Sequence, residues 1–504
     1  MNKMFSLTII VCISLLLLLI PFLNLLSQNG IYNIKDFGAV DDSFVLSKEA
    51  IQSAIDKCAE DGGGKVVVPP GKFVTGALFL KSDITFEVFP GAVLIFDDNI
   101  ENCPIVDGRW EGIERKVYAS LFTGHDLNNV TITGRGTIKG QGKTWWDAHY
   151  INRKLRKEQN LQGREPDNPA DSPLKVPRPR MIYLHNCTNV LISDLTILDS
   201  PSWTIHPVYC ENVTIENISI IQPYESPNTD GINPESCKNV RIFNCFVDCG
   251  DDCITIKSGY NEDGRRVGKA CENIVISNCT FAHGRSAIAI GSEMSGNVRN
   301  VTISNCVFSG TKRGIRIKTG RGRGGIVENY RASNIVMNNV ETAISLDMYY
   351  GIKDKSPALI TEETPFFKNI HLSNITAVDV ENAAQITGLP EAPIDDLSIV
   401  NSNFTAKNGF EVSFVKNLRL EDVTVNCIAG SSLQIYNSHL VEIENFGSDN
   451  PIENTPLVRI DNSDDVYIHS CNLLKGTDIF LRSSQTTNLE LKNNRLQKAE
   501  CVEE

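Results

Sequence analysis

One short phrase of alternating apolar and polar residues recurs along most of the chain. It reads "NVTITG" from Asn129, "NVTIEN" from Asn212 and "NVTISN" from Asn300, and variants continue through Asn334 to Asn488. Alternation with period two predicts a short strand with one buried face. Repeats about 20 to 35 residues apart are typical of a solenoid, in which stacking buries the face that one strand cannot bury alone. We therefore predict an all-β fold, a single-stranded right-handed parallel β-helix, over residues 28–500.

A second strand phrase follows the first in many repeats, as in "DCITIK", "SAIAIG" and "RGIRIK". Aligning these phrases gives one column, made of Ile205, Ile232, Ile254, Ile288, Ile315 and Ile344. Adjacent coils of a β-helix lie about 4.8 Å apart. Residues at a fixed offset from the column should therefore form a row on the surface of the solenoid.

Three segments depart from the repeat. The stretch "SKEAIQSAIDKCAEDGGG", which begins at Ser47, predicts a short amphipathic helix that caps the open end of the solenoid. Residues 143–181 form a charged, proline-bearing loop insertion that we expect to wall a cleft. Coils then resume, and residues 353–500 form the C-terminal coils of the same single domain.

The N-terminal residues 1–27 contain Lys3 followed by a long apolar run. This pattern is typical of a signal peptide, although an uncleaved membrane anchor is the alternative. Either interpretation places the protein outside the cytoplasm, as a secreted, periplasmic or membrane-anchored protein.

Composition narrows the possible partners. The formal net charge is −13, which argues against nucleic acid or an anionic membrane as a partner. The chain has fifteen cysteines, and Asn-Cys pairs recur at one place in the repeat, at Cys187, Cys245, Cys279, Cys306 and Cys427. This pattern predicts buried packing residues rather than a disulfide framework. In "DCGDDC", Cys253 fits this packing role, whereas Cys249 has no assigned role.

Three acids stand out on the alignment. Asp230 and Asp252 both lie two positions before the isoleucine column, and Asp251 lies one position further out. A lone aspartate at a β-turn is usually a turn cap, but three in register should repel one another and raise at least one pKa. Strict alternation would turn Asp230 and Asp252 inward, so we expect each strand to begin after them.

Basic residues follow two coils later. Arg316 and Lys318 alternate with inward isoleucines, so both should point outward and could hold an anionic group. Arg321 and Arg323 are more typical of a solvated loop. His283 lies between the acids and the bases in coil order. The cysteines lack zinc-ligand spacing and no calcium-loop pattern occurs, so we expect no metal and no cofactor.

Four motifs in this region together resemble the polygalacturonase family, glycoside hydrolase family 28. They are "NTD" at 228–230, "GDD" at 250–252, "HG" at 283–284 and "RIK" at 316–318, and the resemblance covers roughly residues 30–450. It implies a pectin-lyase-like solenoid that hydrolyses α-1,4-galacturonosyl bonds of pectin with inversion. The partner would be a pectic polysaccharide or oligogalacturonide, acted on by a monomer without a cofactor.

The resemblance also implies catalytic roles. Asp251 would be the general acid, Asp230 and Asp252 would hold and activate water, and His283 would tune the acid. Inverting glycosidases keep acid and base about 6.5 to 9.5 Å apart, so we expect Asp251 to stand apart from the other two. One departure from the family is Ala282, which replaces the usual glycine before the histidine.

Substrate contacts are implied in the same way. Arg316 and Lys318 would bind the galacturonate carboxylate, Asn228 would contact substrate, and Tyr349 or Tyr350 would stack on a sugar face. Exo action is favoured because the insertion could close one end of the cleft. The alternatives are hydrolysis of a decorated pectin (rhamnogalacturonan or xylogalacturonan), a calcium-dependent pectate lyase, and a non-catalytic glycan-binding solenoid.

Overall fold

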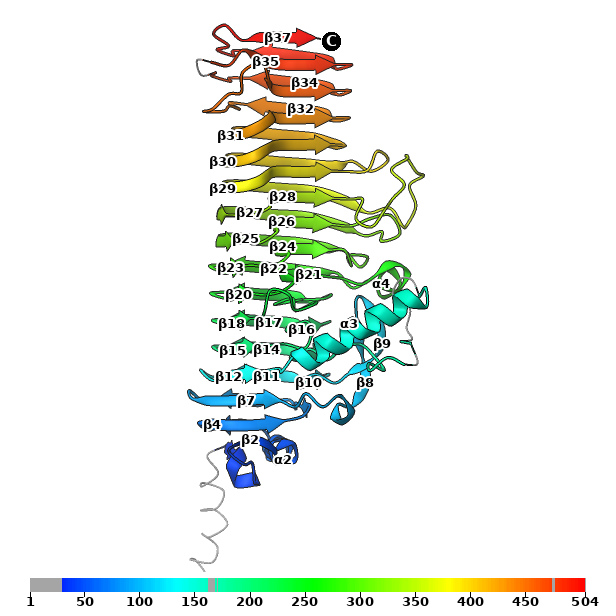
Figure 1. The fold of residues 1–504 in the computed structure, drawn as a ribbon, viewed down its shortest axis with the longest axis vertical. Helices are drawn as coiled ribbons and strands as arrows, with labels where there is room; N and C mark the ends of the chain where they lie inside the picture. The colour runs from blue at the N-terminus through cyan, green and yellow to red at the C-terminus, as the bar shows by residue number, and fades with distance from the viewer. Residues whose placement is uncertain (1–29, 162–167, 170, 474–475, 504) are drawn as a thin grey trace, which may run out of the picture.

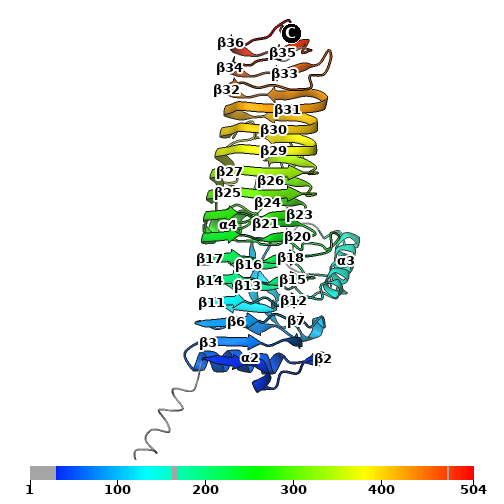
Figure 2. The same ribbon diagram turned by 90° about the vertical axis from the view of Figure 1, so that its left-hand side faces the viewer.

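The chain winds into a tall column of coils, in which strands of successive coils lie side by side (Figures 1 and 2). The structure is a computed structural model and describes residues 30–161, 168–169, 171–473 and 476–503. Strands of successive coils pair in parallel, which confirms the predicted parallel β-helix. The predicted signal peptide or anchor at residues 1–27 lies outside the described residues. Within the described part of the chain, no helix has the length and apolar character needed to cross a membrane.

Each coil contributes up to three strands, which stack into three rows. The first row contains β1 (Ile31–Asn33), β3 (Gly64–Val68), β6 (Ile84–Val88), β11 (Asn128–Thr133), β14 (Thr188–Ser193), β17 (Glu211–Glu216), β19 (Lys238–Phe243) and β22 (Cys271–Ser277). The second row contains β2 (Asp42–Leu46), β4 (Gly71–Thr75), β7 (Ala92–Phe96), β12 (Thr137–Lys139), β15 (Thr196–Leu198), β18 (Ser219–Ile221), β20 (Phe246–Asp248) and β23 (Thr280–Ala282). The third row contains β5 (Leu78–Phe79), β10 (Phe122–His125), β13 (Ile182–His185), β16 (Ile205–Val208), β21 (Asp252–Ile256), β24 (Ser286–Gly291), β26 (Arg313–Lys318) and β28 (Thr342–Asp347).

Towards the C-terminus single strands bend around the corners and join neighbouring rows. The long strands are β25 (Val298–Ser309), β27 (Ile326–Asn338), β29 (Phe366–Thr387), β30 (Ile394–Ser413) and β31 (Val415–Tyr436). The last coils contain β32 (His439–Glu444), β33 (Pro456–Asp461), β34 (Asp464–His469), β35 (Ile479–Ser484), β36 (Thr487–Lys492) and β37 (Glu500–Glu503). Strand β37 thus extends the coils slightly beyond residue 500, the predicted end of the solenoid.

The isoleucine column predicted from the alignment is confirmed in the third row. Ile205 faces Ile232, Ile232 faces Ile254, and the register continues through Ile288 to Ile315 and the next coil. These side chains are fully buried. Apolar residues stacked at one coil position thus fill the interior, and any residue at a fixed offset from them has a predictable place on the outside.

Asparagines at the corners form a ladder along the column. The side-chain amide of Asn239 donates to Asn212 Oδ1 at 3.1 Å, and Asn239 Oδ1 accepts from Asn273 Nδ2 at 3.0 Å. The left-handed backbone needed at this corner suits asparagine, and φ of Asn239 is 57°. One alignment was wrong, because Asn329 rather than Asn334 follows Asn300 in this ladder. Asn329, the first residue of "NYRASN", occupies the corner, and its side-chain amide donates to Asn300.

The cysteines stack inside the column as predicted. Every cysteine of the described residues is unpaired, and all except Cys501 are buried. Cys249 also packs in the interior, where its Sγ lies 3.8 Å from Cys253 Sγ. Packing therefore accounts for Cys249 and Cys253, the two cysteines that flank the aspartate pair.

A helix covers the first coil, as predicted. Helix α2 (Lys48–Glu60) buries Ile51, Ala54, Ile55 and Cys58. Two short 3-10 helices, η1 (Ile34–Phe37) and η2 (Ile100–Asn102), lie in the first coils. The open N-terminal end is thus closed by apolar side chains of the helix.

Further elements project from one side of the column (Figure 1). Strands β8 (Ile105–Trp110) and β9 (Ile113–Tyr118) pair as an antiparallel hairpin, which the sequence pattern missed. The insertion at 143–181 was predicted as a loop, but it begins with helix α3 (Lys143–Glu158). Helix α4 (Asn261–Val267) lies beside the hairpin, and Tyr260 N donates to Gly112 O at 3.1 Å. These elements flank the third row.

Candidate active site

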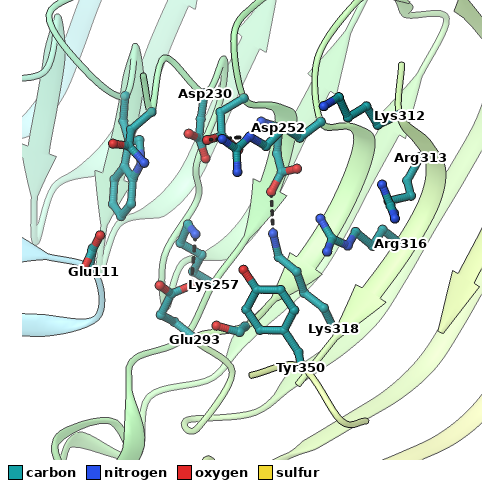
Figure 3. Close-up of a pocket in the computed structure, with 15 residues that line it drawn as sticks. Glu111, Asp230, Asp252, Lys257, Glu293, Lys312, Arg313, Arg316, Lys318 and Tyr350 are labelled. Atoms are coloured by element: carbon teal, nitrogen blue, oxygen red, sulfur yellow. Dashed lines mark hydrogen bonds and ion pairs between the residues drawn. The ribbon is translucent and has the colours of Figure 1, made fainter. Parts of the chain in front are cut away.

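A cleft of about 500 Å³ lies over the third row, beside the projecting elements (Figure 3). We call it the main cleft. It is lined by Glu111, Trp203, Asn228, Asp230, Asp251, Asp252, Lys257, Arg285, Ser292, Glu293, Lys312, Arg313, Arg316, Lys318 and Tyr350. The acids and bases that the alignment placed in rows are therefore brought together, and almost every lining residue is polar or charged.

The three aspartates form one tight cluster. One carboxylate oxygen each from Asp230, Asp251 and Asp252 lies within 4.8 Å of the others. The prediction that Asp251 stands apart is therefore wrong, because the bend at 250–252 returns its side chain towards its neighbours. Strand β21 also begins at Asp252 rather than after it. The carboxylate of Asp252 nevertheless contacts Lys318, which lines the main cleft.

Asp252 is the acid most firmly held in its charged form. Its Oδ2 accepts a hydrogen bond from Lys318 Nζ at 2.7 Å, and its side chain is only 1% exposed. Burial alone would raise the pKa of Asp252, but the positive charges of Lys318 and Arg316 outweigh burial and hold it at about 2. Asp252 is thus a carboxylate at any pH near neutrality and can accept a proton.

The pKa of Asp251 is shifted in the opposite direction, upward. Burial, followed by the negative charge of Asp252, raises its pKa above the ordinary value. The nearby guanidinium of Arg285, with Nε 3.5 Å from Asp251 Oδ2, only partly offsets this effect. A carboxyl group with a raised pKa beside an ionised one is the arrangement expected of a proton donor next to a base.

Asp230 is buried more deeply than Asp251. Its Oδ2 accepts hydrogen bonds from Asn233 Nδ2 at 3.1 Å and from the Thr255 hydroxyl at 3.4 Å. Burial and the charge of Asp251 raise its pKa well above the ordinary value. Of the three carboxyl groups in this space, Asp252 is therefore the one that holds its negative charge most firmly.

Basic groups line the side of the main cleft formed by the later coils. Arg316 and Lys318 lie on β26 beside the ring of Tyr350, at 5.4 Å and 5.5 Å from its centroid. Lys312 and Arg313 extend the same basic surface (Figure 3). In a chain of net charge −13, this local surface is suited to an anionic ligand.

Only one of the two candidate tyrosines lines the cleft. Tyr350 does, whereas Tyr349 is 8% exposed, contacts Arg321 and donates from its hydroxyl to Lys355 O at 3.4 Å. Adjacent residues of one chain point to different sides, so the sequence could not tell which ring faced the cleft. Of the two alternatives, Tyr350 is therefore the ring placed to meet a ligand in the main cleft.

His283 does not line the main cleft. Its Nδ1 lies 3.1 Å from Asp248 Oδ1, and its side chain is 59% exposed. The residue instead shapes the bend below Asp251, since its carbonyl oxygen accepts from Cys253 Sγ at 3.2 Å. The structure thus pairs the imidazole with Asp248 and not with the predicted acid.

Asn228 lies in the lining of the main cleft. Its Oδ1 accepts a hydrogen bond from the guanidinium of Arg178 at 2.8 Å. Arg178 is 2% exposed and also donates to the carbonyl oxygens of Pro201 and Pro227. Asn228 is therefore held in one orientation, with its amide nitrogen left for a ligand or water.

Sequence reasoning missed a second buried ion pair in the cleft. Lys257 Nζ lies 3.0 Å from Glu293 Oε2, and the same ammonium lies over the ring of Trp203 at 4.8 Å. The signal was available, because Lys257 lies three positions after Ile254, just as Lys318 lies three positions after its own column isoleucine. Glu111, by contrast, reaches the cleft from an inserted hairpin that carries no repeat signal.

The aspartate cluster has the spacing of a cation site as well as that of an acid and base pair. Carboxylate oxygens are preferred ligands of Ca²⁺. Here, however, the ammonium of Lys318 already lies 2.7 Å from Asp252, and Arg285 and Lys257 border the same cluster. Protein cations thus supply, next to this cluster, positive charge of the kind that a metal would supply.

Two other groups with metal-ligand spacing lie on the last coils. His439, Asp464 and Asp465 form one half-exposed group, and Glu442, Glu444 and His469 form the other.

Comparison with known proteins agrees with this site. The family model described as glycosyl hydrolases family 28 matches residues 58–389. A probable polygalacturonase of Vitis vinifera is 36% identical over 379 residues, which cover 73% of each chain. An endo-polygalacturonase of Pectobacterium carotovorum is 29% identical over 65% of this chain and 76% of its own length.

A solved structure is similar over most of both chains. The crystal structure of a hyperthermoactive exopolygalacturonase from Thermotoga maritima superposes with a TM-score of 0.62 at 32% identity, covering 78% of this chain and 91% of that one. The matched range includes all four predicted motifs and every residue that lines the main cleft. The chain belongs to glycosyl hydrolase family 28 and is a polygalacturonase-like glycoside hydrolase.

Proposed function

We propose that the protein hydrolyses α-1,4-galacturonosyl linkages in polygalacturonate, the acidic part of pectin. The observation that carries this proposal is the charge division in the main cleft, where Asp252 is held ionised beside Asp251, whose pKa is raised. Hydrolysis needs a base for water and an acid for the leaving oxygen. The basic side of the cleft supports an acidic sugar as the substrate, because Arg316 and Lys318 can pair with its carboxylate.

Each acid then has a role. Asp251 donates its proton to the glycosidic oxygen as the bond to the anomeric carbon breaks. Asp252 accepts a proton from the water that attacks this carbon, and Asp230, whose pKa is raised, orients the same water by hydrogen bonding. Lys318 keeps the base charged before the reaction and also meets the substrate carboxylate. This division refines the sequence interpretation, in which Asp230 and Asp252 acted alike.

Inversion is the proposed stereochemical outcome. The short separation of the acids departs from the usual spacing of about 6.5 to 9.5 Å in inverting enzymes. Support for inversion comes instead from the partners of the base: Asp252 is pinned by Lys318 and lies beside Asp230, so two carboxyl groups can share one water. NMR of the anomeric proton immediately after cleavage tests this point, because a product with retained configuration would exclude it.

We further propose that the enzyme acts from chain ends and outside the cytoplasm, as a monomer. Exo action is supported by the hairpin β8–β9, whose turn residue Glu111 lines the main cleft. Helix α3 lies beside this hairpin (Figure 1). The N-terminal residues 1–27 support export. A viscosity loss far ahead of the release of reducing sugar would contradict exo action, and light scattering of the purified chain measures its oligomeric state.

The decisive assay is incubation with polygalacturonate. The proposal expects new reducing ends without ultraviolet absorbance, and no effect of chelator. Absorbance that disappears with chelator would instead indicate a calcium-dependent pectate lyase. The variants Asp251→Asn and Asp252→Asn should each lose about 10²-fold or more of activity. Asp248→Asn, a matched change on the same coil outside the cleft, should stay near the unmodified rate; full activity of Asp251→Asn and Asp252→Asn would refute the mechanism.

Decorated pectins are the second class of substrate. Rhamnogalacturonan and xylogalacturonan present the same acidic sugar with neutral residues attached or interspersed. A panel of defined pectic oligosaccharides separates these substrates from plain polygalacturonate, because the preferred substrate will have the highest kcat/KM.

A further inference from the structure

A second pocket, of about 490 Å³, lies at the corner where helix α3 begins, and we call it the corner pocket. It is lined by Asp98, Lys139, Gln141, Gly142, Lys143, Thr144, Trp146, Asp147 and Asp199, and shares no described residue with the main cleft. Strand β12 and the residues after β7 and β15 form one wall, and the first turns of α3 form the other. Figure 2 shows α3 beside the coils that contain these strands. Ligand sites typically occupy about 300–1,000 Å³, so the corner pocket has room for a mono- or disaccharide.

Trp146 is the aromatic residue of this lining, and its ring is held in one orientation. Its Nε1 donates to Ser200 O at 3.0 Å. Gly142 packs against the same ring, because a Cβ added at Gly142 would lie 2.5 Å from Trp146 Cζ2. The Trp146 side chain is half-buried, so part of the indole remains accessible. An aromatic ring fixed in advance can receive the apolar C–H face of a sugar with little loss of conformational freedom.

Polar side chains around the indole can bond the hydroxyl groups of such a sugar. Lys143 Nζ lies 2.6 Å from Asp147 Oδ2, and the Thr144 hydroxyl donates to Asp98 Oδ2 at 2.7 Å. A carboxylate has two oxygens with about four acceptor positions, so each of these aspartates can also accept from a ligand hydroxyl. The corner pocket thus combines an aromatic ring with hydrogen-bond acceptors, which match the apolar face and the hydroxyl edge of a pyranose.

The charge of the corner pocket disfavours an acidic sugar. Its lining has three aspartates and two lysines, which gives a formal charge of −1. Both lysines have an aspartate partner, since Lys143 pairs with Asp147 and Lys139 Nζ lies 3.7 Å from Asp199 Oδ2. A uronate carboxylate would therefore meet like charge in this pocket, whereas it meets a basic surface in the main cleft. The pocket is suited to an uncharged sugar.

A metal ion is not favoured as the ligand either. Asp98, Asp147 and Asp199 are not among the groups of described residues whose ligand atoms all lie within 4.8 Å of one another. Calcium needs several oxygens that converge on one point. Acceptors spread around a pocket instead suit a ligand whose hydroxyl groups are distributed around its edge, and a neutral sugar is such a ligand.

We propose that the corner pocket is a second carbohydrate-binding site, which holds a neutral pyranose against Trp146 and bonds its hydroxyl groups to Asp98, Asp147 and Asp199. The inference goes beyond the proposed function, because this site is separate from the hydrolytic aspartates and recognises an uncharged sugar. It gives the enzyme a second point of attachment to a material that contains both neutral and acidic sugars. Such a second attachment raises the effective concentration of the main cleft near its substrate.

The test is affinity electrophoresis of the full chain in gels that contain β-1,4-galactan, a polymer of a neutral pyranose. We expect galactan to retard the unmodified chain. Trp146→Ala should raise the dissociation constant for galactan at least about 10-fold, because the ring face is lost. Trp146→Phe keeps an aromatic face and should bind galactan more tightly than Trp146→Ala does, which separates loss of the ring from a general disturbance of the fold.

Helix α3 offers a matched control. Tyr150 is 46% exposed on the same helix and lies outside the lining of the corner pocket, so Tyr150→Ala should bind galactan like the unmodified chain. The circular dichroism spectrum of each variant reports its folding. The inference is overturned if Tyr150→Ala weakens binding as much as Trp146→Ala does.

A second gel, which contains a pectin with galactan branches, identifies the source of the neutral sugar. This gel uses the Asp251→Asn background, so that the polymer stays intact during the run. If a branch of the bound polymer supplies the sugar, Trp146→Ala weakens binding to the branched pectin but not to the same backbone without branches. If a separate glycan supplies it, Trp146→Ala weakens binding to galactan alone. The inference is overturned if neither polymer distinguishes the unmodified corner pocket from Trp146→Ala. These gels measure binding, so a failure of the proposed hydrolysis is a separate outcome.

Discussion

The pairing of Lys318 with Asp252 makes a quantitative prediction for the acid limb of the pH profile. In the folded protein the pKa of Asp252 is about 2, because Lys318 and Arg316 outweigh the effect of burial. Replacing Lys318 by methionine removes the hydrogen bond at 2.7 Å and leaves a side chain that is 1% exposed. Burial raises the pKa of Asp252, and after the substitution only Arg316 remains of the two cations that lower it. The pKa of Asp252 should therefore rise to its ordinary value of about 3.8 or above.

The magnitude follows from that change. A rise of about two pKa units corresponds to about 2.7 kcal/mol in favour of the protonated form. The base must be ionised to accept a proton, so activity is lost as the pH falls through its pKa. The acid limb of kcat/KM set by Asp252 should therefore move upward by about two pH units in Lys318→Met. Substrate carboxylates titrate in the same range, but they do so equally with every variant.

The assay is reducing-sugar release from polygalacturonate between pH 3 and 7, with each profile normalised to its maximum. Lys312→Met is the matched control, because Lys312 lines the main cleft without pairing with Asp252. Both variants should bind substrate more weakly, but only Lys318→Met should shift the acid limb. An unshifted limb in a Lys318→Met protein with the unmodified circular dichroism spectrum would refute the assignment of Asp252 as the base.

Three further changes test the scaffold and the substrate contacts. Glu235→Gln should lower the free energy of unfolding, measured in urea, by about 3 to 5 kcal/mol, because Arg109 is fully buried and its Nε lies 2.5 Å from Glu235. The control is Glu114→Gln, at a half-exposed partner of Arg109, which should lower the free energy of unfolding by less than about 1 kcal/mol. Asn239→Ala should cost about 1 kcal/mol more than Asn239→Gly in the same measurement, because both remove the ladder bonds but only alanine is strained at φ 57°; equal losses would contradict the strain argument. Tyr350→Ala should raise KM several-fold while Tyr350→Phe leaves it unchanged, since the ring face is what meets a sugar; a phenylalanine variant as weak as the alanine variant would point to the hydroxyl instead.

The repeat made much of this structure predictable from sequence. Once the isoleucine column was aligned, the common offset of Asp230 and Asp252 predicted that they are neighbours, and their carboxylates lie in one cluster. Lys318 has another offset, three positions after its column isoleucine. The same offset would have placed Lys257 in the cleft, three positions after Ile254. A parallel solenoid converts sequence spacing into spatial neighbours because each coil has the same register as the next.

The parts that were missed lie outside the register. Helix α3 and hairpin β8–β9 are insertions, so no column predicts where Glu111 will lie. The orientation of a side chain at a bend is lost as well. Asp251 was expected to stand apart, which was wrong, and the sequence could not choose between Tyr349 and Tyr350, because alternation does not hold where a strand begins or ends.

The different protonation of the three aspartates arises from the neighbours that each one meets along the column. All three are acids of one type in one cluster, and burial raises the pKa of each. Asp252 alone meets a lysine at hydrogen-bonding distance, supplied by β26 two coils further on. If a single cation on one row selects the base, moving that cation by one coil would select a different acid. In the proposed mechanism, the coil that supplies Lys318, rather than the type of acid, therefore decides which aspartate acts as the base.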